Sequence, residues 1–197
     1  MNRDETITHA LRFGYGGMSR NELCHLYDIS HGKTILELGS MVGMSSFVMA
    51  SVCDVLHCVD AWDDEQKHLA HDKPQQDVYF SFLPNLPVMM NNFLTNCNNF
   101  IESKKIIMHR GLTGERVQDF EDDYFDIILI DADHSYEGVK NDCLTYMNKL
   151  KSDGNLVFHD YNCGMWTGVS KLCNEMVDEK RLELVSVVER LASFKKV

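Results

Sequence analysis

The stretch from Thr34 to Ala50 constrains this chain most, because it specifies a strand, a turn and a helix in succession. Ile35 to Leu38 is an apolar run of the kind that a strand buried on both faces requires. Gly39 and Gly43 then leave room for a tight turn, and from Met44 the apolar residues recur at helical spacing. A helix that leaves such a turn points unpaired backbone N–H groups back at it. The segment therefore predicts a small-molecule site.

Two classes of ligand are bound at such a turn. Dinucleotide-binding folds place the pattern G-x-G-x-x-G there, because a pyrophosphate lies against the helix N-terminus. In this chain a carboxylate, Glu37, precedes Gly39, and Gly43 follows without a third glycine. A carboxylate at this place repels phosphate and favours a ligand that carries an ammonium or sulfonium group. The simpler alternative is an ordinary strand–turn–helix unit of an α/β domain.

This segment resembles motif I of the class I S-adenosylmethionine-dependent methyltransferases, and it is most similar to the small catechol-type and macrocin-type O-methyltransferases. The resemblance extends over about residues 13–197. It implies one Rossmann-like α/β domain, with a doubly wound, mostly parallel seven-stranded sheet that ends in an antiparallel strand pair. Residues 1–32 would form an N-terminal helical segment that leads into the core, 33–197. The implied reaction transfers a methyl group from S-adenosylmethionine to an oxygen of a small-molecule or sugar acceptor.

Composition narrows the possible partners. The chain has 197 residues, enough for one domain with a full core, and a net charge of −11, which disfavours nucleic acid as a partner. Its seven cysteines show no C-x-x-C spacing, which indicates reduced thiols in a cytoplasmic protein. The N-terminus lacks the apolar core of a signal peptide, and no apolar run is long enough to span a bilayer, so we expect no membrane partner. A homo-oligomer is compatible with these features.

Periodicity and capping signals predict the remaining elements. Ser19 and Glu22 form a capping box, and Ser135 is placed to cap a helix whose inner stripe continues to Leu150. We expect a turn at Asp153-Gly154 before the next strand. The other predicted strands are 55–59, 105–109, 125–130, 155–158, 182–188 and 191–197, and the other helices lie near 7–11, 86–100 and 167–180. Residues 63–76 are interpreted as a polar connector; a metal-binding pair, His68 and His71, is the less favoured alternative.

Several residues are candidates for holding the cofactor. Asp60 ends the second predicted strand, 21 positions after Gly39, where an acid can accept hydrogen bonds from a ribose diol. Trp62 could cover the adenine face or be a rim aromatic. The resemblance implies that adenine lies against the loop Gly111 to Thr113 and that residues 17–19 lie over the cofactor. The full predicted set is Glu37, Gly39, Ser40, Met41, Gly43, Ser45, Asp60, Trp62, Gly111, Leu112, Thr113 and Asp131.

Acidic side chains follow two strands that a crossover helix connects. Because neighbouring parallel strands lie ~4.8 Å apart and end at the same edge, Asp131 and Asp160 should project side by side. Carboxylates that close repel unless one is protonated or a cation lies between them. The resemblance implies a divalent cation, Mg²⁺ or another, held by Asp131 and Asp160, and His159 is added as a candidate ligand although it departs from the family pattern, as does Tyr161, where the catechol type has an amide. His159 stands where the macrocin type has an acid, and an imidazole favours later transition metals.

His134, three residues after Asp131, is the predicted general base. The related families carry a lysine or a histidine at this place. O-methylation requires removal of the hydroxyl proton, and an imidazole with a pKa near neutral suits that task. A solvated histidine beside a helix cap is the structural alternative. Two other functions compete: an NAD-dependent oxidoreductase, disfavoured by Glu37 and the missing glycine, and a non-catalytic cofactor-binding module, disfavoured by the full set of polar residues.

Overall fold

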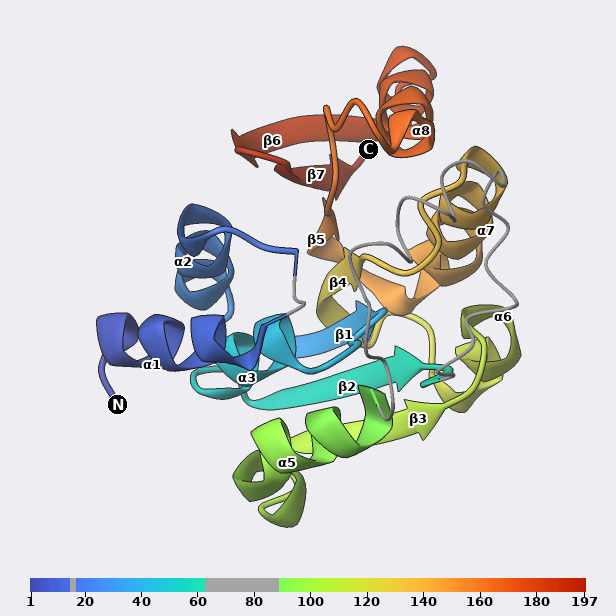
Figure 1. The fold of residues 1–197 in the computed structure, drawn as a ribbon. Helices are drawn as coiled ribbons and strands as arrows, with labels where there is room; N and C mark the ends of the chain where they lie inside the picture. The colour runs from blue at the N-terminus through green and yellow to red at the C-terminus, as the bar shows by residue number, and fades with distance from the viewer. Residues whose placement is uncertain (15–16, 63–88) are drawn as a thin grey trace.

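The computed structural model describes residues 1–14, 17–62 and 89–197 and is centred on a seven-stranded sheet (Figure 1). The strand order is β3-β2-β1-β4-β5-β7-β6. Strands β1 to β5 are parallel, whereas β7 runs antiparallel to both β5 and β6. The predicted Rossmann-like fold with a terminal antiparallel pair is thus confirmed. The strands are β1 (Thr34–Leu38), β2 (Val55–Asp60), β3 (Ile106–Arg110), β4 (Phe125–Ile130), β5 (Leu150–Phe158), β6 (Leu182–Val188) and β7 (Leu191–Lys196).

Helices cover both faces of the sheet, and each face has its own apolar core (Figure 1). In β1, Ile35 belongs to one core while Leu36 and Leu38 belong to the other, which explains why the strand has apolar side chains on both faces. The first core is covered by α1 (Arg3–Ala10), α2 (Arg20–Ile29), α3 (Met44–Ala50) and α5 (Met89–Glu102). The second is covered by α7 (Tyr136–Tyr146) and α8 (Thr167–Asp178), and the short helix α6 (Thr113–Arg116) follows β3.

Helix starts agree with the capping signals. The Ser19 side chain accepts a hydrogen bond from the backbone N–H of Glu22, whose carboxylate in turn accepts from the backbone N–H of Ser19. The Ser135 hydroxyl accepts from the backbone N–H of Gly138 at the start of α7. The predicted first turn at 86–88 and the pair His68 and His71 lie outside the described residues.

The predicted boundary between α7 and β5 was wrong. The helix ends at Tyr146, a 3₁₀ turn spans Met147–Lys149, and Leu150 opens β5 by pairing with Phe125. Asp153-Gly154 therefore lies within the strand instead of forming a turn, and the register shifts between Phe125 and Ile127 to accommodate the extra residues. The physical reason is the pairing of Leu150 with Phe125, a residue distant in sequence, which local helical periodicity does not reveal.

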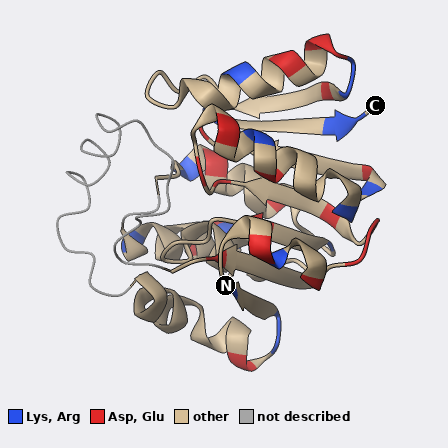
Figure 2. Cartoon of the chain, turned by 90° about the vertical axis from the view of Figure 1, so that its right-hand side faces the viewer, with Lys and Arg blue, Asp and Glu red and all other residues tan. Residues whose placement is uncertain are grey.

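In the view of Figure 2, Lys and Arg are scattered among the elements and interspersed with Asp and Glu, and they do not gather in one basic region. Among the described residues, no helix is both long and apolar enough to span a membrane.

Candidate active site

A cavity of about 620 Å³ opens at the carboxyl ends of the parallel strands. Residues at the end of each parallel strand line it, among them Gly39 after β1, Asp60 from β2, Gly111 after β3, Asp131 after β4 and His159 after β5. Open α/β sheets bind their ligands at this edge. The volume falls within the range of small-molecule sites in proteins.

The two glycines of the turn after β1 are both required by space and by backbone conformation. Gly39 has φ +88°, and a Cβ there would lie 2.3 Å from the carbonyl oxygen of Asp131. Gly43 has φ +87°, and its Cβ would lie 2.6 Å from Sγ of Cys97. Side chains are disfavoured in this left-handed region and would not fit. The turn therefore presents bare main chain at the cavity, together with Ser40, Met41 and Ser45.

Glu37 lies beneath this turn and does not line the cavity. Its side chain is fully buried and accepts hydrogen bonds from the hydroxyls of Ser40 at 2.7 Å, Ser45 at 2.5 Å and Ser46. Burial raises the pKa of Glu37, and the three hydroxyls oppose that shift. The structure thus places Glu37 where it holds the turn together, with its carboxyl group directed at protein donors.

Asp60 lines the cavity and also ties the end of β2 to the turn. One carboxylate oxygen accepts from the backbone N–H groups of Ser40 and Met41, each at 2.8 Å. The other accepts from the backbone N–H of Trp62 at 2.6 Å. Trp62 itself is 2% exposed and is not part of the cavity lining. Its indole N–H donates to the carbonyl of Met41 at 3.0 Å, and its ring packs on Phe93, so it supports the turn from the core side.

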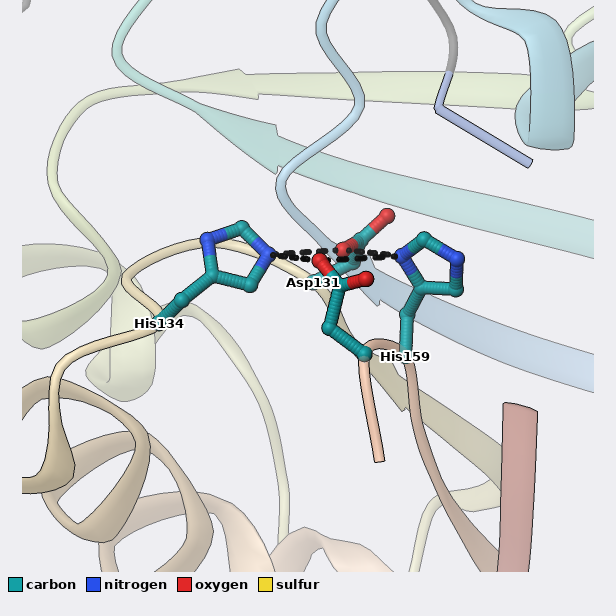
Figure 3. A group of neighbouring side chains, drawn as sticks. Asp131, His134 and His159 are labelled. Atoms are coloured by element: carbon teal, nitrogen blue, oxygen red, sulfur yellow. Dashed lines mark hydrogen bonds and ion pairs between the residues drawn. The ribbon is translucent and has the colours of Figure 1, made fainter. Parts of the chain in front are cut away.

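Asp131, His134, His159 and Asp160, here called the Asp131 cluster, meet at the ends of β4 and β5. Figure 3 shows the imidazoles of His134 and His159 approaching Asp131 from opposite sides. The Asp131 carboxylate lies 3.1 Å from Nε2 of His134 and 3.0 Å from Nδ1 of His159. Asp160 lies 3.2 Å from Nε2 of His134. The structure thus brings together all four side chains that the sequence placed after these two strands.

Buried charges on three sides hold His159 in its protonated form. Burial alone would lower the pKa of His159, but Asp131, Glu22 and Asp160 raise it to about 10. Glu22 reaches the site from α2, fully buried, with its carboxylate 3.6 Å from Nε2 of His159. Burial would raise the pKa of Asp131, but the two imidazoles lower it below its usual range.

Arg190 joins the cluster from the tip of the β6–β7 hairpin. Its guanidinium donates to Asp160 at 2.7 Å and to the carbonyl oxygen of Gly17, and it lies 3.8 Å from Glu22. Its backbone N–H donates to Glu22 at 2.9 Å. Asp160 is held with φ +59°, a conformation that non-glycine residues adopt rarely. The hairpin, the segment before α2 and the end of β5 are thereby fixed to one another.

Trp166 packs against the predicted base. Its ring stacks on the His134 imidazole with centroids 5.0 Å apart and an interplanar angle of 27°. Trp166 is nearly buried, whereas its neighbour Met165 is 40% exposed, and both line the cavity. His134 is consequently held in one orientation at the boundary between the cavity and the 161–166 loop.

Three residues of the site were not predicted from the sequence: Glu22, Arg190 and Asp142. Glu22 was interpreted only as a capping residue and Arg190 only as part of a hairpin connection. Asp142 is an acid on the face of α7 that also carries apolar residues, and it is 2% exposed. The one signal in the sequence is the position of this acid beside the apolar residues of the predicted helix, where a charged side chain is unusual.

Comparison with known families identifies the chain. The family model described as "Methyltransferase domain" matches residues 36–161, which run from β1 to the residue after Asp160. The fold is that of a class I S-adenosylmethionine-dependent methyltransferase, and this chain belongs to the methyltransferase-domain family. No curated protein matches the sequence significantly.

Solved structures share the fold at low sequence identity. The SAH-bound methyltransferase PaMTH1 from Podospora anserina is 13% identical, with a TM-score of 0.66, and the match covers 98% of this chain and 88% of that one. The O-methyltransferase from Bacillus cereus in complex with SAH is 14% identical, with a TM-score of 0.60 and coverage of 97% and 89%. The O-methyltransferase TomG from Streptomyces achromogenes, in complex with SAM, is 11% identical, with a TM-score of 0.61 and coverage of 98% and 86%.

Proposed function

We propose that this methyltransferase methylates a hydroxyl group of a small-molecule or sugar acceptor, with His134 as general base and a divalent cation in the Asp131 cluster. The observation that carries the proposal is the position of the cluster. It lies at the ends of β4 and β5, in the same cavity as the bare main chain at Gly39. A methyl donor on that turn and a hydroxyl beside His134 would therefore share one enclosed space.

The charge of the cavity suits the cofactor. Six acidic residues line it, and Arg190 is the one Lys or Arg among the described lining residues. Because that guanidinium is already paired with Asp160, the lining favours a cation such as the sulfonium and ammonium groups of S-adenosylmethionine. The acidic lining residues are Asp60, Glu115, Asp131, Asp133, Asp142 and Asp160. Bound S-adenosylmethionine supplies an electrophilic methyl group.

His134 has the surroundings of a general base. Its Nε2 lies 3.1 Å from Asp131 and 3.2 Å from Asp160, so two carboxylates stabilise the imidazolium that forms when His134 takes the acceptor proton. The stack on Trp166 limits rotation of the ring. The acceptor hydroxyl would lie between this imidazole and the turn that holds the cofactor.

The donor atoms of the cluster fit a metal ion. All four lie within 4.8 Å of one another. Two ligands that are each about 2.0–2.2 Å from one ion lie about 3.0–3.5 Å apart. Among the proposed ligands, Nδ1 of His159 lies 3.0 Å from Asp131 and 3.7 Å from Asp160, so small side-chain shifts would bring all three to one ion. We propose Asp131, His159 and Asp160 as ligands, with His159 giving up, when an ion binds, the proton that the surrounding carboxylates hold on it. An imidazole among the ligands favours a later transition metal over Mg²⁺. Such a cation would lower the pKa of a nearby hydroxyl.

Calorimetric titration of the wild-type protein with S-adenosylhomocysteine and with NAD tests the cofactor. We expect S-adenosylhomocysteine to bind and NAD to bind at least a hundredfold more weakly, because the turn lacks the pyrophosphate pattern. Preferential binding of NAD would contradict the methyltransferase function. Methyl transfer from labelled S-adenosylmethionine to a panel of phenols and sugars then tests the chemistry. Cofactor binding without transfer to any hydroxyl acceptor would favour the non-catalytic alternative.

A further inference from the structure

The two ring nitrogens of His159 face different partners. Nδ1 is directed into the Asp131 cluster, where it lies 3.0 Å from Asp131 and 3.7 Å from Asp160 (Figure 3). Nε2, on the far side of the ring, lies 3.6 Å from Oε1 of Glu22. The imidazole thus stands between the proposed cation site and a carboxylate that comes from α2.

An imidazole binds a metal ion only through a nitrogen that carries no proton. In neutral histidine one ring nitrogen holds a proton and the other a lone pair. A carboxylate at position 159 would face no such restriction, because both of its oxygens carry lone pairs. The hydrogen bond made by one nitrogen decides which nitrogen is left for the metal. His159 therefore needs a partner that keeps the proton on Nε2 and leaves Nδ1 to the cation.

Glu22 has the surroundings of a fixed acceptor. It is fully buried, and its Oε2 accepts from the backbone N–H of Ser19 at 2.7 Å while its Oε1 accepts from the backbone N–H of Arg190 at 2.9 Å. The Arg190 guanidinium lies 3.8 Å away, and these donors together favour the ionised carboxylate. Backbone groups of two separate elements thus hold Glu22 in place, with Oε1 facing Nε2 of His159.

The opposite tautomer of His159 would place two acceptors against each other. His159 is 3% exposed, and Nε2 has no partner at hydrogen-bond distance among the described residues. Without its proton, Nε2 would turn a lone pair to the Glu22 carboxylate, and a buried polar group left in that position is costly. With the proton on Nε2 the contact is attractive, at a separation about 0.5 Å longer than an ordinary hydrogen bond.

We infer, on the basis of the proposed cation, that Glu22 is the positioning residue for the ligand His159: it keeps the proton on Nε2, so that Nδ1 is the nitrogen presented to the ion. Carboxylates are common partners of metal-bound histidines, and losing one weakens metal binding about 10- to 100-fold. Glu22 lies outside residues 36–161, which the methyltransferase-domain model matches. Helix α2 would thereby belong to the metal site although the family match begins in β1.

Calorimetric titration with Co²⁺ compares wild-type protein with Glu22→Gln. The amide can turn either its oxygen or its NH₂ group to Nε2, so both tautomers of His159 become possible. We expect the affinity for Co²⁺ to fall about 10- to 100-fold. Ser19→Ala is the matched control, since it removes the hydroxyl that caps the same helix and keeps the Glu22 carboxylate with its backbone donors. It should leave the affinity unchanged.

Two further measurements separate positioning from packing. Glu22→Asp keeps the charge and loses length, whereas Glu22→Gln keeps the shape and loses the charge. A positioning role predicts that the Asp variant binds Co²⁺ more tightly than the Gln variant, and a packing role predicts the reverse. Long-range ¹⁵N–¹H correlations of Zn²⁺-loaded wild-type protein, assigned by their loss in His159→Gln, should show the His159 proton on Nε2.

The outcomes distinguish the inference from the function on which it rests. Equal Co²⁺ affinity of wild-type protein and Glu22→Gln, or a proton on Nδ1 of His159 in the Zn²⁺-loaded protein, would overturn the inference alone. The second measurement needs no variant at position 22, so it decides even where Glu22→Gln fails to fold. Wild-type protein that binds neither ion would contradict the proposed cation, and the role of Glu22 with it.

Discussion

Two imidazole–carboxylate clusters lie on the same sheet and differ in charge. In the Asp131 cluster the imidazoles face two carboxylates of the cluster and, from α2, Glu22. The second, here called the His57 cluster, contains His57, His109 and Asp119. In this cluster, Nδ1 of His57 lies 3.0 Å from Nε2 of His109, and Nδ1 of His109 lies 3.4 Å from the Asp119 carboxylate. The residue types are the same, but only one carboxylate is in reach of the second pair.

Protonation follows the number of carboxylates and not the depth of burial. Burial lowers the pKa of His57 to about 4, with a contribution from His109, and the rings of Phe120 and Phe125 pack around it. The more deeply buried His159 has its pKa raised to about 10 because acids surround it. His57, in an apolar setting, thus stays neutral, whereas His159, among carboxylates, becomes a cation.

The sharpest test of this contrast is catalytic. Replacing His134 by Ala should lower the rate of methyl transfer about 10²- to 10⁴-fold, since proton removal by a positioned base contributes that much. The affinity for S-adenosylhomocysteine, measured by calorimetry, should remain within a fewfold of wild type. The matched change His109→Gln in the His57 cluster should leave the rate nearly unchanged. Full turnover by the His134 variant would show that the base assignment is wrong.

Removing one carboxylate from each cluster compares how much the two clusters contribute to the free energy of unfolding. Glu22→Gln should lower the free energy of unfolding by about 3 kcal/mol, because it leaves the buried His159 cation with one partner fewer. Asp119→Asn removes a carboxylate that is 36% exposed and should cost less than about 1 kcal/mol. Urea denaturation at pH 7 measures both values. Equal losses would mean that burial does not distinguish the two clusters.

Chelation should affect one cluster only. Exhaustive treatment with a chelator is expected to lower methyl transfer about a hundredfold, because a cation in the Asp131 cluster contributes several kcal/mol of charge stabilisation. Re-addition should restore activity, with Mn²⁺, Co²⁺ or Zn²⁺ more effective than Mg²⁺. Elemental analysis should show that Asp160→Asn retains less metal than His57→Phe. Activity that persists in metal-free protein would remove the cation from the proposal.

Lowering the pH should destabilise the folded protein through His57, because this imidazole is neutral in the folded chain. The pKa of His57 is lower in the folded chain, about 4, than the 6.5 of an ordinary histidine, so the unfolded chain binds more protons between these values. This contribution to stability is complete above pH 6.5 and is lost as the pH falls towards 4. We expect a loss of about 2 kcal/mol between pH 7.5 and pH 5. His57→Phe should reduce that loss in denaturation curves; an unchanged pH dependence would contradict the assignment.

Much of the fold followed from local patterns. The apolar runs at 35–38 and 125–130 and the capping residues Ser19 and Ser135 define their elements within a few positions, because strand burial and helix capping depend on neighbours in sequence. The start of β5 did not follow, because Leu150 enters the sheet through pairing with Phe125, a partner distant in sequence. Helical periodicity therefore extended α7 too far.

The residues of the candidate site also fall into those that local sequence patterns predict and those whose position depends on tertiary contacts. Gly39, Asp60 and Asp131, singled out in the sequence because each stands at the end of a recognisable strand, all line the cavity. Trp62 and Glu37 were singled out by position, but neither lines the cavity: Trp62 packs on Phe93, and Glu37 accepts hydrogen bonds from the serines of the turn. Which way a side chain points at a strand end depends on what packs beside it, and no local pattern records that.

By itself, the sequence determined the order of strands and helices, the two glycines of the turn and the acids at the strand ends, since these depend on short-range periodicity and backbone preference. The tertiary structure decided how charges that are distant in sequence combine. It brought Glu22 from α2 and Arg190 from the terminal hairpin against His159 and Asp160, and it set Asp142 behind Thr113. Electrostatic interactions depend on distance in space and on burial, and both are fixed only when the helices have packed on the sheet.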